Sequence, residues 1–181
     1  MPVELWAMDE HRLGLKPILR RVWCKRGSSP VAVIHPRYEW MYVYGFVHPE
    51  SGRTFWLIMP TVNTAVMSAA LKEFAEDVGA GKTRRILLVL DGAGWHISQG
   101  LVVPEGIELV GLPAYSPELQ PAERLWSFVD EPFANRAPKD LDTMEQTLVQ
   151  RCQQLGKERE LLRGPTLFHW WPTHADSQRP A

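Results

Sequence analysis

Two acidic side chains stand where predicted strands end, at positions that suit chemistry. Asp91 follows residues 86–90 (Ile-Leu-Leu-Val-Leu), an apolar run typical of a central strand covered on both faces. Asp9 follows residues 4–8, a segment that also predicts a strand ending at the acid. Ligands of open α/β sheets bind beyond the carboxyl ends of strands, so both aspartates are expected at one crevice.

A third acid, Glu123, follows a stiff connection that contains Pro113, Pro117 and Pro121. Pro121 suits the first turn of a helix. The apolar residues of that helix recur at helical spacing, at Ala122, Leu125, Trp126, Val129 and Phe133. Glu123 lies on the flank of this stripe. Three converging carboxylates would repel one another without a cation, so the set favours divalent Mg²⁺ or Mn²⁺, which prefer oxygen ligands.

The segments around these acids resemble a known family. Residues 8–10 (Met-Asp-Glu), 90–96 (Leu-Asp-Gly-Ala-Gly-Trp-His) and 116–126 (Ser-Pro-Glu-Leu-Gln-Pro-Ala-Glu-Arg-Leu-Trp) look like the three acidic motifs of mariner-type DDE transposases, nearest to the bacterial insertion-sequence branch. The third motif is the most specific, with Gln120 where the family usually has Asn. The resemblance spans roughly residues 3–155. It implies a ribonuclease-H-like fold and gives the catalytic and metal-binding roles to Asp9, Asp91 and Glu123.

The resemblance also implies an activity, namely metal-dependent DNA cleavage and strand transfer in cut-and-paste transposition. Two Mg²⁺ or Mn²⁺ ions on the three acids would activate water or a DNA 3′-hydroxyl and stabilise the leaving oxygen. The expected partners are transposon ends and target DNA, at the nucleoid in a bacterial cytoplasm. Relatives carry a helix-turn-helix region ahead of the catalytic part. We expect that region to be missing here, or supplied by an upstream protein, and the protein to be inactive without it. A homodimer is compatible with this scheme.

Two alternative functions stay open at this stage. The same acids would serve another ribonuclease-H-like nuclease, such as a ribonuclease or resolvase, although the third motif favours a transposase. A truncated or inactive remnant would act only as a DNA-binding or assembly module. Each acid also has a simpler interpretation alone: Asp9 as a solvated acid, Asp91 in a nucleotide site, and Glu123 as a first-turn acid favoured by the helix dipole.

Two further polar residues lie beside the predicted acids. His96, five positions after Asp91, would orient a metal-bound water or a phosphate; it would equally cap a helix or pack against Trp95. Glu10 points to the opposite face from Asp9, which predicts a structural role or an ion pair with a nearby arginine. Both interpretations depend on the fold.

The totals describe an ordinary globular chain: 181 residues, 45% apolar and 23% charged, which suits one domain with a sizeable core. No stretch resembles a membrane span or a signal peptide, and Cys24 and Cys152 are expected as free thiols.

The net charge of −1 lacks the basic excess usual in DNA-binding proteins. A basic cluster nevertheless follows Asp9, and it would track a DNA backbone or form a solvated loop or protected edge. Its members are Arg12, Lys16, Arg20, Arg21, Lys25 and Arg26. Tyr115 is a further candidate for DNA contact, whereas Trp126 is expected in the core.

The order of the remaining elements predicts the fold class. Strands are expected at 19–24, 39–47, 54–59 and 107–112, with helices at 64–78, 97–101, 121–133 and 142–155. Asn63 would cap the first helix, and Asp142 with Glu145 would form a capping box. Three early strands followed by alternating helices and strands predict an α/β, ribonuclease-H-like mixed five-stranded sheet flanked by helices.

We expect residues 1–156 to form the catalytic domain, with residues 157–181 as a C-terminal extension. Gly164-Pro165 would break the chain within this extension. Residues 169–172 (His-Trp-Trp-Pro) would dock on the core, and residues 173–181 are expected to be disordered.

Overall fold

The computed structural model describes residues 1–31, 37–113 and 116–173. Within these residues five strands form one sheet in the order β3-β2-β1-β4-β5. The strands are β1 (Val3–Gly14), β2 (Trp40–His48), β3 (Arg53–Met59), β4 (Arg85–Leu90) and β5 (Ile107–Gly111). β1 pairs antiparallel with β2 and parallel with β4, while β5 runs parallel to β4. The predicted mixed five-stranded α/β sheet is confirmed.

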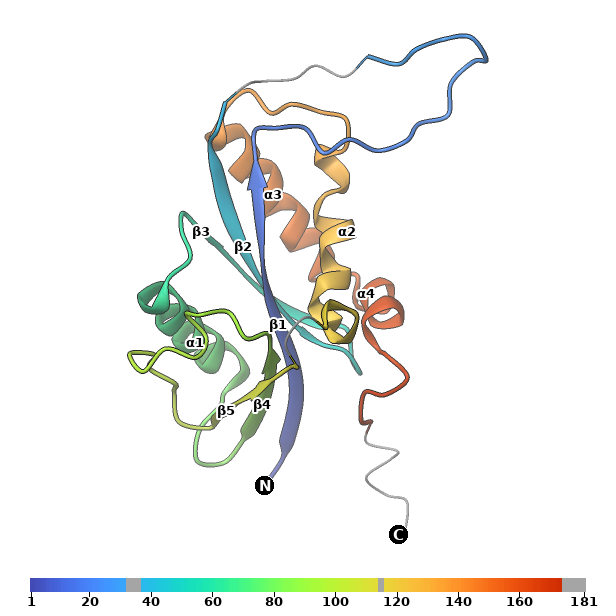
Figure 1. Ribbon diagram of the computed structural model, residues 1–181. Coiled ribbons are helices and arrows are strands. Elements are labelled where there is room, and N and C mark those ends of the chain that lie inside the picture. The colour runs from blue at the N-terminus through green and yellow to red at the C-terminus, as the bar shows by residue number, and fades with distance from the viewer. Residues whose placement is uncertain (32–36, 114–115, 174–181) are drawn as a thin grey trace.

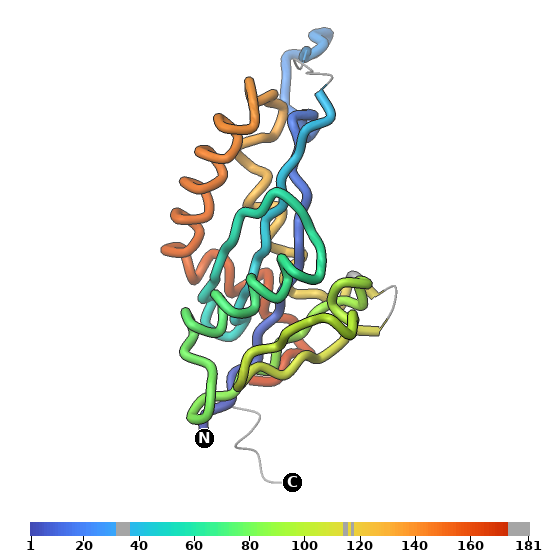
Figure 2. The backbone as a smooth tube through the Cα atoms, turned by 90° about the vertical axis from the view of Figure 1, so that its left-hand side faces the viewer, coloured from blue at the N-terminus to red at the C-terminus, as the bar shows by residue number. Residues whose placement is uncertain are grey.

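Helices cover both faces of the sheet (Figure 1). α1 (Thr64–Val78) packs on one face, while α2 (Trp126–Val129), α3 (Leu141–Leu155) and α4 (Arg159–Thr166) contribute to the other. Short 3₁₀ segments at Pro117–Leu119, Pro121–Leu125 and Glu131–Phe133 flank α2. Figure 2 shows the chain turned by 90°, with α3 running alongside the long strands β1 and β2.

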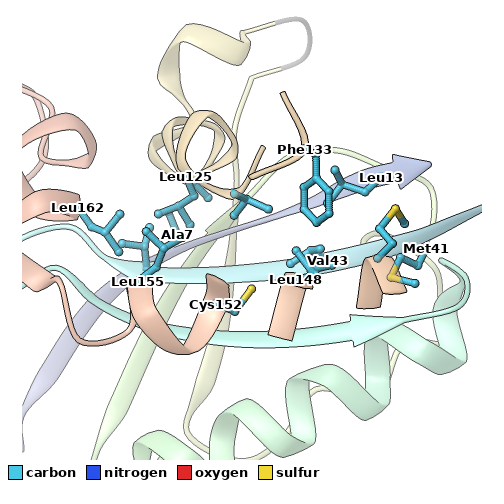
Figure 3. Close-up of a cluster of buried hydrophobic side chains, with 14 of the residues drawn as sticks. Ala7, Leu13, Met41, Val43, Leu125, Phe133, Leu148, Cys152, Leu155 and Leu162 are labelled. Carbon is cyan, nitrogen blue, oxygen red and sulfur yellow. The ribbon is translucent and has the colours of Figure 1, made fainter. Parts of the chain in front are cut away.

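Two hydrophobic clusters lie on the two sides of the sheet, because alternate strand residues point to opposite faces. Trp6 and Leu88 pack beneath α1, whereas Ala7 and Val89 belong to the cluster beneath α3. Figure 3 shows the second cluster, to which the helices α3 and α4 contribute four labelled side chains. These are Leu148, Cys152, Leu155 and Leu162. The same alternation determines toward which face of the sheet the side chain of each further strand residue points.

The ends of the long helices follow local sequence signals. Asn63 accepts a hydrogen bond from the backbone N–H of Val66 and caps α1, as predicted, and Gly79 ends it in a left-handed conformation. The predicted capping box at the start of α3 is wrong. Asp140, two residues earlier than expected, accepts from the N–H of Thr143.

β1 is longer than its sequence predicted, since it runs five residues beyond Asp9 to Gly14. Those residues pair with β2, from Asp9 opposite Gly45 to Gly14 opposite Trp40, and this neighbour sustains the extended backbone. The edge strand predicted at 19–24 is wrong: these residues are exposed and pair with no strand among the described residues. Residues 15–31 instead leave the sheet at the end opposite the N-terminus (Figures 1 and 2).

Two other local predictions fail. Residues 97–101 form turns and not a helix, and Gly164-Pro165 lies inside α4 without breaking it. The proline removes the N–H that would bond the carbonyl of Leu161, but the last turn still closes, because the N–H of Leu167 donates to the carbonyl of Arg163. Cys24 and Cys152 are free, as expected. No helix among the described residues has the length and apolar character needed to cross a bilayer.

The segment after α4 docks on the core as predicted, through Trp171, which is 2% exposed. Trp171 belongs to the cluster beneath α3, and its backbone N–H donates to the carbonyl of Phe168. Its neighbour Trp170 is 37% exposed. Most of residues 173–181, which we expected to be disordered, lie outside the described residues.

Trp171→Ala should lower the free energy of unfolding by about 3–5 kcal/mol, because it removes a large buried side chain from the core. Trp170→Ala is the matched control and should cost much less. Urea unfolding followed by circular dichroism measures both. Equal losses in the two variants would contradict the docking of Trp171.

Candidate active site

Asp9 and Asp91 stand at the same level on neighbouring strands. The parallel register of β1 and β4 ends with Ala7 opposite Val89, and each aspartate follows two residues later. Side chains two apart on a strand share a face, and adjacent strands lie about 4.8 Å apart. Both carboxylates therefore start from the face that carries α2 and α3.

Glu123 reaches the same region from the Pro121–Leu125 3₁₀ segment, which is anchored on both sides to β1. The side-chain amide of Gln120 donates to the carbonyl of Met8 at 3.0 Å, and the indole N–H of Trp126 donates to Oδ2 of Asp9 at 2.8 Å. Glu123 stands three residues from each anchor. Partial burial raises its pKa, the charge of Arg124 lowers it, and the charge of Asp91 raises it further. The acidic groups thus lie within each other's electric field.

Asp9 is half-buried, and burial raises its pKa to about 6. The hydrogen bond from Trp126 opposes this shift, whereas the negative charges of Glu10 and Asp91 add to it. Its Oδ1 accepts the backbone N–H of Glu10, and its Oδ2 accepts the indole of Trp126. Two donors thus fix the orientation of a carboxylate that is costly to ionise without a nearby cation.

His96 joins two carboxylates from a buried position, with 1% of its side chain exposed. Its Nδ1 lies 2.8 Å from Oδ1 of Asp91, and its Nε2 lies 2.8 Å from Oε1 of Glu10. Burial lowers the pKa of His96, but the hydrogen bond and charge of Glu10, followed by Asp91, outweigh it and leave the pKa raised. His96 also packs edge-on against Trp95.

Of the two roles predicted for Glu10, the structural one is found, and no arginine among the described residues pairs with it. Its Oε1 faces His96 and also accepts the indole N–H of Trp95 at 3.0 Å. No local pattern indicated the Glu10–His96 pair, because its members are 86 residues apart and meet only when β4 lies beside β1. Glu10 thus supports Asp91 through His96.

Gly45 makes room for the indole that holds Asp9. It lies opposite Asp9 in the β1–β2 register, and a Cβ atom there would be 2.8 Å from Cη2 of Trp126. The Trp126 ring therefore packs over a position without a side chain. We had expected Trp126 to be a core residue only, and its contact with Asp9 was missed.

The predicted basic residues lie at and beyond the end of β1. All of Arg12, Lys16, Arg20, Arg21, Lys25 and Arg26 are exposed. Arg20 is tied to the body, because its guanidinium donates to the carbonyl of Ser127 and its backbone N–H to Asn135. Tyr115 falls outside the described residues. Among the described residues, none of the six basic side chains forms an ion pair with the three acids.

The three predicted ligands are all carboxylates, which suit a hard divalent cation. A cation would also favour the ionised form of Asp9, whose pKa is raised by burial and by neighbouring negative charges. No three His, Cys, Asp or Glu side chains of the described residues are arranged closely enough to hold a metal. The structure brings Asp9 and Asp91 to adjacent positions and Glu123 near them. Closing the three around an ion would require adjustment of the side chains.

A family model of the DDE superfamily endonuclease matches residues 4–145, a span that contains all three acids. The chain belongs to this family. A relative from Sinorhizobium fredii (strain NBRC 101917 / NGR234), the uncharacterized protein y4pE/y4sA, is 40% identical over 104 residues. That match covers 57% of this chain and 76% of the relative.

Solved structures of the mariner transposase Mos1 share the fold of this DDE endonuclease. The Mos1 strand transfer complex matches with a TM-score of 0.58 at 14% identity, covering 93% of this chain and 56% of the other. The isolated Mos1 catalytic domain matches with a TM-score of 0.51 at 11% identity over 91% and 83% of the two chains. A retroviral intasome, from simian T-cell lymphotropic virus, has a TM-score of 0.53 at 12% identity, covering 83% and 47%. The chain thus spans little more than half of the full Mos1 chain.

Glu10→Ala should destabilise this endonuclease domain by about 3–5 kcal/mol, because it removes one partner of a buried ion pair and leaves His96 facing a void. Glu10→Gln keeps an acceptor for the indole of Trp95 and should cost less. Denaturant unfolding of the two variants beside the parent gives the comparison. If Glu10→Ala unfolds at the parental midpoint, the Glu10–His96 contact is not stabilising the fold.

Proposed function

We propose that this DDE endonuclease is the catalytic domain of a transposase, which cleaves DNA strands and joins the freed transposon ends to target DNA. The observation that carries the proposal is the in-register placement of Asp9 and Asp91 with Glu123 anchored beside them. The sequence motifs around the three acids support the same assignment. The likeness to Mos1 structures adds the fold, and those structures include a paired-end complex of the Mos1 transposase with a transposon end.

Asp9, Asp91 and Glu123 would together hold two Mg²⁺ or Mn²⁺ ions. Mos1 relatives are described as complexes with Mn and with Mg, which supports divalent metals of this kind. When bound, the ions supply activation of the attacking water or DNA 3′-hydroxyl and stabilisation of the leaving oxygen. Carboxylate oxygens are the ligands that these cations prefer.

The surrounding residues of the chain position these acids. Trp126 and the backbone N–H of Glu10 hold the Asp9 carboxylate in one orientation. His96 holds Asp91 through its Nδ1, while its Nε2 contacts Glu10. Because neutralisation by these donors is partial, the site keeps a net negative charge that favours cations over free phosphate.

DNA is the proposed partner, and the exposed basic residues after Asp9 would contact its backbone. Arg12 and Lys16 are the members of this cluster nearest to Asp9 in sequence. Arg21, Lys25 and Arg26 belong to the segment 15–31, which leaves the sheet (Figure 1). With a net charge of −1 for the chain, this local cluster is the part suited to phosphates. Assembly with further copies on paired ends belongs to the same proposal.

Asp91→Asn should reduce metal-dependent nicking of supercoiled DNA by about 100-fold or more, because it removes a ligand charge worth several kcal/mol in the transition state. Asp9→Asn and Glu123→Gln should do the same. Glu118→Gln, an exposed acid on the same connection, is the matched control and should retain activity. Manganese binding measured by electron paramagnetic resonance provides an independent readout, which should fall in the three variants only.

Strand-transfer assays with transposon ends separate a transposase from another nuclease of the same fold. Joining of a labelled end to target DNA by the parent, and not by Asp91→Asn, is the expected result. Equal nicking by parent and Asp91→Asn would contradict the assignment of the site.

A further inference from the structure

A second feature suited to nucleic acid lies at the far end of β1, away from the three acids. A hollow of about 520 Å³ opens there between the end of β1, the start of β2 and the residues just before it. This is the uppermost end of the sheet in Figure 1. The volume is in the range of about 300–1,000 Å³ typical of sites for small organic groups.

Two exposed aromatic rings line the hollow. Tyr38 is 74% exposed and Trp40 is 43% exposed, although large aromatic side chains usually lie in the core. Trp40 stays uncovered partly because Gly14 stands directly opposite it in the register and has no side chain. The hollow therefore offers apolar ring surface to solvent.

A cationic side chain lies over each ring. The guanidinium carbon of Arg12 lies 5.4 Å from the centre of the Trp40 ring, and Nζ of Lys16 lies 4.2 Å from that of Tyr38. Neither cation makes an ion pair among the described residues. The positive charges are thus held over the rings, and they are not neutralised by carboxylates there.

The acidic residues of the hollow have partners of their own. Asp130 contacts Nε2 of His11 at 2.7 Å, and Glu39 lies 3.9 Å from the guanidinium of Arg37. The hollow is lined by three cationic side chains and two acids, and each acid contacts a basic group. The excess of positive charge attracts anions. Ring surface together with free cations is the combination that binds single-stranded nucleic acid, with bases stacked on the rings and phosphates on the cations.

We propose that this hollow binds an unpaired nucleotide of a DNA strand. Its base would stack on Trp40 and Tyr38, and its flanking phosphates would contact Arg12 and Lys16. A paired base inside a duplex does not expose its faces to such rings, so the site selects unpaired DNA. This inference rests on the proposed function, because that function makes DNA the substrate.

His11, which lines the hollow, connects it to the candidate active site. His11 stacks on Trp126 with ring centres 4.9 Å apart, and the indole of Trp126 holds Asp9. The nucleotide site and the acids therefore lie along the same strand and share a rigid contact.

Binding of a single-stranded oligothymidylate that carries one 2-aminopurine tests the proposal, in EDTA so that the acids play no part. Quenching of the 2-aminopurine on binding is expected for the parent. Trp40→Ala and Tyr38→Ala should each weaken binding by about 5- to 150-fold and reduce the quenching. Trp40→Phe and Tyr38→Phe, which keep a ring, should restore most of both.

Trp170→Ala is the matched control, since it removes an exposed tryptophan remote in sequence and should leave oligonucleotide affinity unchanged. Arg12→Gln and Lys16→Gln should each lower the slope of log affinity against log salt by about 0.7, as expected for one phosphate contact on a single strand. Fully paired duplex should be affected much less than the single strand by loss of either ring.

The outcomes separate this proposal from the proposed function. Ring-dependent quenching without metal-dependent nicking would uphold the nucleotide site and contradict the transposase assignment. Nicking by the parent, together with parental single-strand affinity in folded Trp40→Ala and Tyr38→Ala, would overturn the nucleotide site alone. Circular dichroism shows whether each variant is folded, and the phenylalanine variants keep the test decisive if an alanine variant is not.

Discussion

The parallel pairing of β1 with β4 is the constraint on which the candidate site depends. With Ala7 opposite Val89, Asp9 and Asp91 follow at the same level and on the same face. A slip of one residue would turn Asp9 toward α1 while leaving Asp91 where it is. The apolar residues before the acids are buried on both faces, so the core that stabilises the sheet also fixes the register of the acids.

That register concentrates negative charge, and the local structure offsets only part of it. Trp126 donates to Asp9 across a strand position kept clear by Gly45, and His96 bridges Asp91 to Glu10. Each contact needs a residue from a different part of the chain. The remaining repulsion appears in the pKa of Asp9, which burial and the neighbouring charges raise to about 6. A bound cation would offset this penalty, which supports the proposed metal role of the three acids.

Sequence alone predicted the elements that local pattern determines and missed those that need a partner. The alternation of residues 39–47 and the cap at Asn63 act within a few residues, and both elements formed as expected. The last five residues of β1 are extended because β2 pairs with them, whereas residues 19–24 lack such a neighbour among the described residues. Of the site, the motifs identified the three acids, whose catalytic role stays a prediction. The Glu10–His96 pair depends on strand order, which no local pattern reveals.

β1 also sets the distance between the two proposed DNA contacts. From Asp9 to Gly14 the strand advances five residues, or about 17 Å at 3.3–3.4 Å per residue. Stacked bases rise by about 3.4 Å per nucleotide, so this length of β1 equals that of about five stacked nucleotides. An extended, unstacked strand would cover that distance with fewer. The residues by which β1 exceeds its predicted end therefore separate the proposed nucleotide site from the candidate active site. Their extended backbone depends on the antiparallel pairing with β2.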